Sequence, residues 1–128
     1  ISSLLEKGEL PDEKSKETVS SLIQRLLEKA INLNASDIHL EIQKDFLRVR
    51  FRIDGVLQEM GKLSTELSPQ IFSRVKILGD MDIAVQRQPQ DGHYSYLAKN
   101  NSHFDLRIST IPASKREENG LLRLLDQI

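Results

Sequence analysis

The 128-residue sequence contains no cysteine, few aromatic residues and no long hydrophobic run. The lack of cysteine excludes a disulfide framework, a thiolate metal site and a cysteine nucleophile. No stretch approaches 18 consecutive apolar residues, and no leader of basic followed by apolar residues is present, so we expect no membrane span and no secretion signal. The sequence therefore predicts one soluble and most simply cytoplasmic domain, and its first residue, Ile1, suggests a piece of a longer protein.

The motifs of phosphoryl-transfer enzymes and hydrolases are also missing. The six glycines are scattered, and none belongs to a Gly-rich phosphate loop, a Gly-Lys-Ser/Thr motif or a Gly-x-Ser-x-Gly elbow. The three histidines, His39, His93 and His103, do not have the spacing of metal ligands, so we expect no metal site. A binding or regulatory module without catalytic residues of its own is the better prediction.

The charge of the chain is nearly balanced, with 18 basic and 19 acidic side chains and a net charge of −1. A nucleic-acid-binding domain usually needs a strongly basic surface. Aromatic side chains that stack on bases are few, and Phe51 and Phe104 fall on the apolar faces of predicted strands. We therefore expect no nucleic-acid partner.

The N-terminal part divides into a linker and a helix. Residues 1–17 carry Gly8, Pro11 and mixed charge, which is typical of a linker or a loosely attached segment. From Val19 to Ile31 the apolar residues recur at i, i+3, i+4 and i+7 spacing. This period predicts a helix near 18–33 with one buried stripe.

Residues 38–42 and 47–53 alternate between apolar and polar side chains, which predicts two half-buried strands. A turn at Lys44-Asp45 sets the register of this hairpin. It places Leu40 opposite Val49 and Ile38 opposite Phe51, so that apolar side chains share one face. A slip of one residue would turn every side chain to the other face, whereas this register satisfies both faces.

Three arginines share the polar face of the second strand: Arg48, Arg50 and Arg52. The register places Glu41 opposite Arg48 and Asp37 opposite Arg52. Cross-strand ion pairing is therefore the favoured interpretation. A phosphate-binding or partner-binding surface is the alternative that the sequence leaves open.

The remaining elements are read from turn and cap residues. Asp54-Gly55 predicts a tight turn into a short strand at 56–60, and Asp91-Gly92 predicts another turn within a loop at 84–92. Ser68-Pro69 predicts the capped start of a helix at 69–79, on which Arg74 and Lys76 lie either on a solvated face or at a subunit contact. Strands are expected at 94–98, 104–110 and 121–125, with a polar loop at 112–120.

These elements follow the order α-βββ-α-βββ. The order predicts an α+β fold, a mixed, mostly antiparallel sheet of about six strands with two helices packed on it. Ile38, Leu40, Leu47, Val49, Phe51, Ile53, Leu106 and Ile108 are the expected core.

Several ordered motifs occur together at defined spacing. They read ASDIHLE at 35–41, LRVRFRIDGVL at 47–57, SRVKIL at 73–78, MDIA at 81–84, PQDG at 89–92, FDLRISTIP at 104–112 and LRLLD at 122–126. This series resembles the second N-terminal domain of the type II secretion and type IV pilus assembly ATPases. The resemblance runs from residue 19 to residue 126, and an ordered series is far more specific than one short pattern.

The resemblance implies that residues 18–128 form a PAS-like domain that precedes a RecA-like motor domain absent from this sequence. The parent protein would be a hexameric cytoplasmic ATPase that powers pilin or pseudopilin movement at the inner membrane. ATP and Mg²⁺ would be held mainly by the motor. Its partners would be its own motor domain, neighbouring subunits and the inner-membrane machinery of a secretion system, a pilus or a DNA-uptake apparatus.

The resemblance also assigns Arg107 and Arg123 to the phosphates of the bound nucleotide as the two domains close. A guanidinium is permanently charged and presents two donors to phosphate oxygens, and it stabilises charge that develops during phosphoryl transfer. Salt bridges to Asp105, Asp126 or Glu118 are the structural alternative for these arginines.

The sequence departs from the family pattern at two places. His93 follows the PQDG motif where many relatives have another basic residue, and Glu117-Glu118-Asn119 stands where relatives usually have Gly-Glu-Lys or Gly-Glu-Arg. The alternative function, from a different class, is a stand-alone PAS-like module that senses a ligand or binds another protein.

Overall fold

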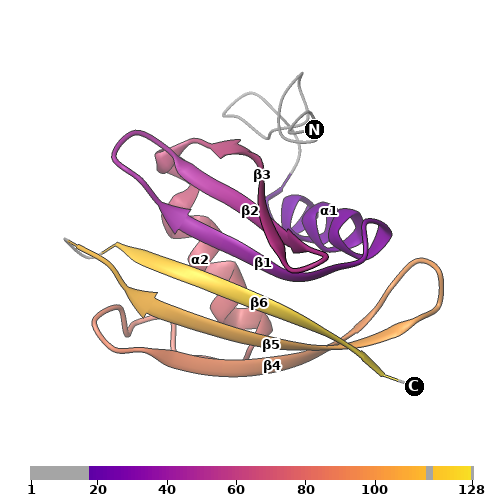
Figure 1. Ribbon diagram of the computed structural model, residues 1–128. Coiled ribbons are helices and arrows are strands. Elements are labelled where there is room, and N and C mark those ends of the chain that lie inside the picture. The colour runs from indigo at the N-terminus through magenta and orange to yellow at the C-terminus, as the bar shows by residue number, and fades with distance from the viewer. Residues whose placement is uncertain (1–17, 115–116, 128) are drawn as a thin grey trace.

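A computed structural model describes residues 18–114 and 117–127, and its six strands form one antiparallel sheet. The strands lie in the order β3-β2-β1-β6-β5-β4 (Figure 1). Along the chain the elements are α1 (Val19–Asn32), β1 (Ala35–Ile42), β2 (Leu47–Ile53), β3 (Val56–Leu63), the short 3₁₀ helix η2 (Thr65–Leu67), α2 (Ser68–Leu78), β4 (Gln90–Leu97), β5 (His103–Pro112) and β6 (Glu118–Gln127).

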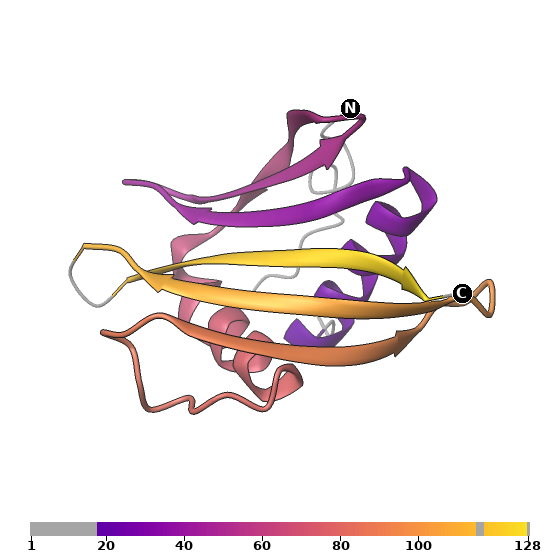
Figure 2. The ribbon, with the colours of Figure 1, turned by 60° about the horizontal axis from the view of Figure 1, so that its bottom comes forward.

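Both helices pack against the same face of the sheet (Figure 2). We call this face the helix face. We call the opposite face the open face, because no described helix or strand covers it. The predicted α+β architecture of six strands and two helices is confirmed. Where the sequence predicted a mixed sheet, all neighbouring described strands are antiparallel.

The sheet consists of two three-stranded meanders, β1-β2-β3 and β4-β5-β6, joined where β1 pairs with β6. Within the first meander the predicted hairpin register is confirmed, with Leu40 opposite Val49 and Asp37 opposite Arg52. The turn at Asp54-Gly55 is also confirmed. Both residues have positive φ, 52° and 79°, as a type I′ turn requires.

The core lies between the helix face of the sheet and the apolar stripe of α1. Thr18 caps this helix, since its hydroxyl accepts a hydrogen bond from the Ser21 amide at 3.1 Å. The stripe is buried at Leu22, Ile23, Leu26, Leu27, Ala30 and Ile31. All the predicted core strand residues are buried except Ile53, which is partly buried at the edge of the core.

The predicted start of α2 is wrong in its cap. Ser64 caps the preceding turn, where its hydroxyl accepts from the Glu66 amide, and α2 follows without a side-chain cap. Ser68 is instead the first residue of α2. It is buried, and its Oγ has no hydrogen-bond partner among the described residues. The side-chain cap is thus at Ser64, before the 3₁₀ helix η2, and not at Ser68.

The predicted turn at Asp91-Gly92 is also wrong, because β4 already begins at Gln90. Gly92 has no positive φ. Its backbone packs against that of Gly79 so closely that a Cβ at position 92 would lie 2.3 Å from the Gly79 carbonyl oxygen. The glycine is needed for close approach of two backbone segments and not for a turn.

Other strands are longer than the sequence suggested. β5 reaches Pro112 and β6 begins at Glu118, so both ends of the predicted polar loop at 112–120 belong to the sheet. The predicted linker, residues 1–17, lies outside the described residues. Within the described ranges, no helix has the length and apolar character needed to cross a bilayer.

Candidate functional site

Charged side chains form a row across the open face of the sheet. Strand register brings His93 opposite Arg107, Arg107 opposite Arg123, Arg123 opposite Asp37, and Asp37 opposite Arg52. We call these five residues the cross-sheet row. They share the open face because side chains alternate along a strand, and the neighbouring residues Leu106, Ile108, Leu122 and Leu124 are buried on the helix face.

The two arginines singled out by the sequence are neighbours in this row. Their side chains are 58% and 56% exposed. Arg107 contacts Asp105 on its own strand, with Nε and Nη2 at 2.9 and 2.8 Å from Asp105 Oδ2. Arg123 is held more loosely, with Nε 3.8 Å from Asp37 Oδ1. The salt bridge of Arg107 to Asp105 is one of the predicted alternatives, whereas the partner of Arg123 was not predicted.

Asp37 is the acidic centre of the row, and it is 7% exposed. Its Oδ2 accepts a hydrogen bond from Arg52 Nε at 3.1 Å and lies 3.6 Å from His39 Nε2. Because one carboxylate serves both Arg52 and Arg123, Arg123 shares its counter-charge with Arg52. This leaves Arg123 less neutralised than a one-to-one ion pair would.

The predicted pairing of Arg48, Arg50 and Arg52 with acids on β1 is confirmed. Arg50 donates from Nε and Nη2 to the two oxygens of Glu41, both at 2.8 Å, and Arg48 Nε lies 3.3 Å from Glu41 Oε1. Arg50 makes this bidentate pair along the diagonal, since its direct neighbour across the strands is His39. Such fork-to-fork pairs are among the stronger ion pairs of proteins.

The ionisation of Glu41 reflects these partners. Its partial burial alone would raise the pKa, because burial disfavours the charged form. The hydrogen bond from Arg50 and the charges of Arg50, Arg48 and His39 outweigh burial and lower the pKa of Glu41. The hydrogen bond to Glu41 likewise raises the pKa of Arg50. The β1-β2 hairpin thus holds its arginines in place with its own carboxylates.

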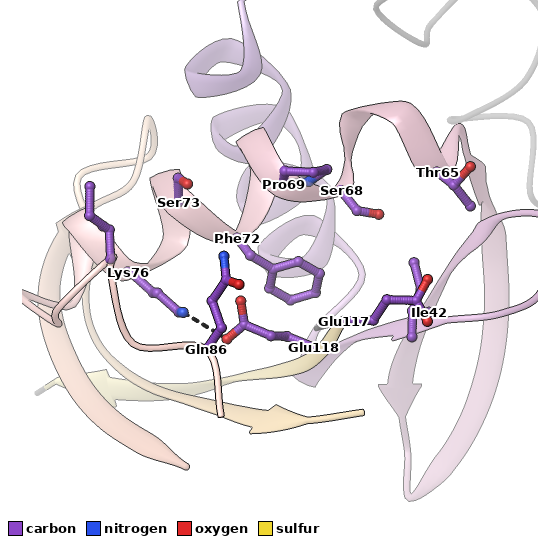
Figure 3. Close-up of a pocket in the computed structure, with 11 residues that line it drawn as sticks. Ile42, Thr65, Ser68, Pro69, Phe72, Ser73, Lys76, Gln86, Glu117 and Glu118 are labelled. Carbon is purple, nitrogen blue, oxygen red and sulfur yellow. Dashed lines mark ion pairs between the residues drawn. The ribbon is translucent and has the colours of Figure 1, made fainter. Parts of the chain in front are cut away.

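Lys76 does not lie on a solvated helix face or at a free surface, so that prediction is wrong. Its side chain is 1% exposed, and Nζ lies 2.7 Å from Oε1 of Glu118, which is also buried. Nζ also donates to the Val85 carbonyl at 2.5 Å. Figure 3 shows this ion pair beside a pocket of about 160 Å³ into which the ring of Phe72 projects.

Sequence reasoning missed this buried ion pair and the role of Asp37. The only available signal for the pair was an acidic residue, Glu118, at the start of an apolar strand. Among the described residues, no three histidine, aspartate or glutamate side chains come together as ligands for a metal ion. What the open face offers chemically is permanent positive charge at Arg107 and Arg123.

Comparison with known families matches residues 12–128 to the family described as Type II/IV secretion system protein. The chain belongs to this family. Type II secretion system protein E of Pseudomonas aeruginosa is 43% identical over 122 residues, which cover 95% of this chain and 24% of that protein. Type II secretion system ATPase E of Vibrio cholerae is 44% identical over 109 residues, which cover 85% of this chain and 21% of that protein.

This member of the type II/IV secretion family therefore spans about a quarter of the length of the curated relatives it matches. Its fold also resembles part of a solved structure, that of the Legionella pneumophila ATPase DotB. The TM-score is 0.61 over 90% of this chain and 31% of the other, at 20% sequence identity. At that identity the similarity concerns the fold alone.

Proposed function

We propose that this chain is a regulatory and assembly domain of a hexameric secretion or pilus ATPase, and that Arg107 and Arg123 reach the phosphates of its nucleotide. The nucleotide would be held by a RecA-like motor domain outside this sequence. Family membership and the relatives named as ATPases support the proposal. The observation that carries it is the side-by-side placement of two arginines, each more than half exposed, on the open face.

The arrangement suits an anionic ligand. Like charges directly opposite on neighbouring strands repel each other, so the Arg107–Arg123 neighbourhood is unfavourable unless negative charge is supplied. Asp105 and the shared Asp37 supply only part of it. Phosphate oxygens would supply the rest and accept the two donors of each guanidinium. Mg²⁺ would be held by the motor domain, since both carboxylates of this neighbourhood already face arginines.

The same face extends over Arg48, Arg50 and Arg52, whose side chains are 30%, 26% and 37% exposed. In our proposal they border the surface on which the motor domain closes. Residues 18–128 form the PAS-like domain, residues 1–17 lead into it, and neighbouring subunits and the inner-membrane machinery are the further partners. His93, opposite Arg107 on the edge strand β4, extends the row toward the sheet edge.

The test uses the full-length parent protein with Arg107→Ala and Arg123→Ala, and with Arg87→Ala, at an exposed arginine of the loop between α2 and β4, as the control. We expect each of the first two changes to lower kcat by roughly tenfold or more while nucleotide affinity changes much less, as for a cation that acts in the transition state. Arg87→Ala should leave kcat nearly unchanged. Parental kcat in a folded, hexameric Arg107→Ala or Arg123→Ala protein would contradict the proposal.

The isolated chain serves as a second control. Because it has no phosphate loop, we expect residues 1–128 to show no ATP turnover above background. Turnover by this chain that a point change within it abolished would assign catalysis to the domain itself and overturn the proposal.

A further inference from the structure

A hollow of about 230 Å³ lies between α1, α2 and the edge strand β4, on the helix side of the sheet. α1 contributes Ser20 and Gln24, α2 contributes Arg74, and β4 contributes Tyr94 and Tyr96. The arginines of the proposed nucleotide contact lie on the opposite face of the sheet. The hollow is therefore separate from that site, and what it binds does not depend on the proposed function.

Arg74 brings a positive charge to this hollow without a matching negative one. It is partly buried, and no described residue forms an ion pair or hydrogen bond with it. Its Nε is fully shielded from water and lacks an acceptor. Buried polar groups are nearly always hydrogen-bonded, and a partly buried charge without a partner is unfavourable. A negative charge beside the Arg74 guanidinium is therefore what the hollow lacks.

Glu28 of α1, whose neighbour Tyr96 lines the hollow, is already engaged. Glu28 accepts a hydrogen bond from the Tyr96 hydroxyl, and its two oxygens lie 3.4 and 3.2 Å from the Lys99 amide nitrogen. In contrast, the hydroxyls of Ser20 and Tyr94 have no partner among the described residues. Two neutral donors therefore accompany the uncompensated guanidinium.

The position of Ser20 gives a further reason to expect an anion in the hollow. It lies in the first turn of the 14-residue helix α1, which contains no acidic residue in that turn. The amide dipoles at a helix N-terminus favour negative charge within about one turn. The helix dipole and the charge of Arg74 therefore both favour an anion in the same place.

We propose that this hollow binds a single carboxylate group of side-chain size. One guanidinium neutralises one negative charge, and its planar fork matches the two oxygens of a carboxylate. The volume is below the roughly 300–1,000 Å³ of pockets that enclose drug-sized ligands, so the bound group is small. Apolar side chains of Ile23 and Leu78 line the hollow and would contact a short aliphatic stem.

The test follows the Nε–Hε resonance of Arg74 in the ¹⁵N-labelled 128-residue chain. Arg74→Lys identifies this signal by removing it. Butyrate and acetate are the free carboxylate probes, and N-acetylglutamic acid amide presents the same group as a protein side chain. Butyramide is the uncharged control for shape, and sodium chloride is the control for ionic strength. We expect saturable shifts with the carboxylates alone, and tighter binding of butyrate than of acetate because of its longer stem.

Variants separate the site from unspecific charge effects. With the Tyr94 ring signals as readout, Arg74→Gln should weaken butyrate binding by roughly tenfold or more, the loss expected for one charge-assisted hydrogen-bonded pair. Arg87→Gln, which removes an exposed loop arginine, should leave binding unchanged. An unchanged amide spectrum outside the hollow establishes that each variant is folded.

The comparison of probes also identifies the natural source of the carboxylate. Tighter binding of N-acetylglutamic acid amide than of butyrate supports an acidic side chain of a protein partner, and the reverse order supports a free small acid. Equal shifts with chloride, absence of saturation by any carboxylate, or unchanged binding to Arg74→Gln would overturn the proposal.

Discussion

The ammonium of Lys76 in α2 and the carboxylate of Glu118 at the start of β6 form a buried ion pair at 2.7 Å. The pair ties the helix to the strand that carries Arg123. Because Lys76 Nζ also donates to the Val85 carbonyl, the same ammonium fixes the segment between α2 and β4. One buried cation thus joins three parts of the chain.

We predict that Lys76→Met lowers the free energy of unfolding by about 3–5 kcal/mol, because it leaves the Glu118 carboxylate buried without a counter-charge. Urea denaturation measures the change. The exposed Lys44→Met is the matched control and should alter stability by less than about 0.5 kcal/mol. The double change Lys76→Met with Glu118→Leu should recover much of the loss. A double variant no more stable than Lys76→Met alone would contradict the electrostatic explanation.

Gly92→Ala tests the close packing of β4 against the end of α2. A Cβ at this position would meet the Gly79 carbonyl oxygen at 2.3 Å, and backbone atoms cannot move aside as side chains do. We expect a loss of about 3 kcal/mol or more. Gly120→Ala is the control, because its Cβ would meet the ring of Phe72 at 2.9 Å, and a ring can rotate away at about 1 kcal/mol. An equal or larger loss for Gly120→Ala would contradict this prediction.

Thr110→Val should be neutral or stabilising by up to about 1 kcal/mol. Thr110 is fully buried, and its Oγ1 has no hydrogen-bond partner among the described residues. Valine has nearly the same shape and removes the unsatisfied hydroxyl. Thermal and urea denaturation measure the change, and a destabilised variant would indicate an acceptor or a water bound to this hydroxyl.

The stability of the domain should depend on the ionisation of Glu41. Its pKa is lowered in the folded state, so its contribution is present above the unfolded value of about 4.5 and is lost as pH falls through the folded pKa. Urea denaturation between pH 7 and pH 3 measures this loss. We expect Glu41→Gln to cost about 1–2 kcal/mol at pH 7 and to make the acid-side decline shallower. Parallel pH profiles for the two proteins would contradict the assignment.

The sequence predicted the β1-β2 hairpin down to its register, because a turn at Lys44-Asp45 sets a pairing in which both faces are satisfied. It did not predict the environment of Lys76, since lysine on a helix usually indicates solvent and its acidic partner lies on a distant strand. The PQDG motif was interpreted as a turn for a similar reason. The dipeptide Asp-Gly is typical of turns, and only the folded structure brings Gly79 against Gly92.

The candidate site, like the fold, was predictable from the sequence only in part. Strand alternation placed Arg107 on a polar strand face, whereas Arg123 interrupts a strand that is otherwise leucine on both faces. The direct opposition of the two arginines depends on the β5-β6 register. That register could not be inferred while residues 112–120 were assigned to a loop. The contact of Arg123 with Asp37 depends on the pairing of β6 with β1, which no local pattern encodes.

The meander topology has a consequence for the order of assembly during synthesis. β1, β2 and β3 pair with sequence neighbours and can form as soon as they leave the ribosome, whereas β1 remains without its second neighbour until β6 emerges. Such a non-local closure is slow compared with hairpin formation. A nascent chain halted before β6 lacks Arg123. Without β6, the strand β1 that carries Asp37 is not paired with the meander that contains Arg107. The two arginines therefore become neighbours only after β6 has been synthesised and has joined the two meanders.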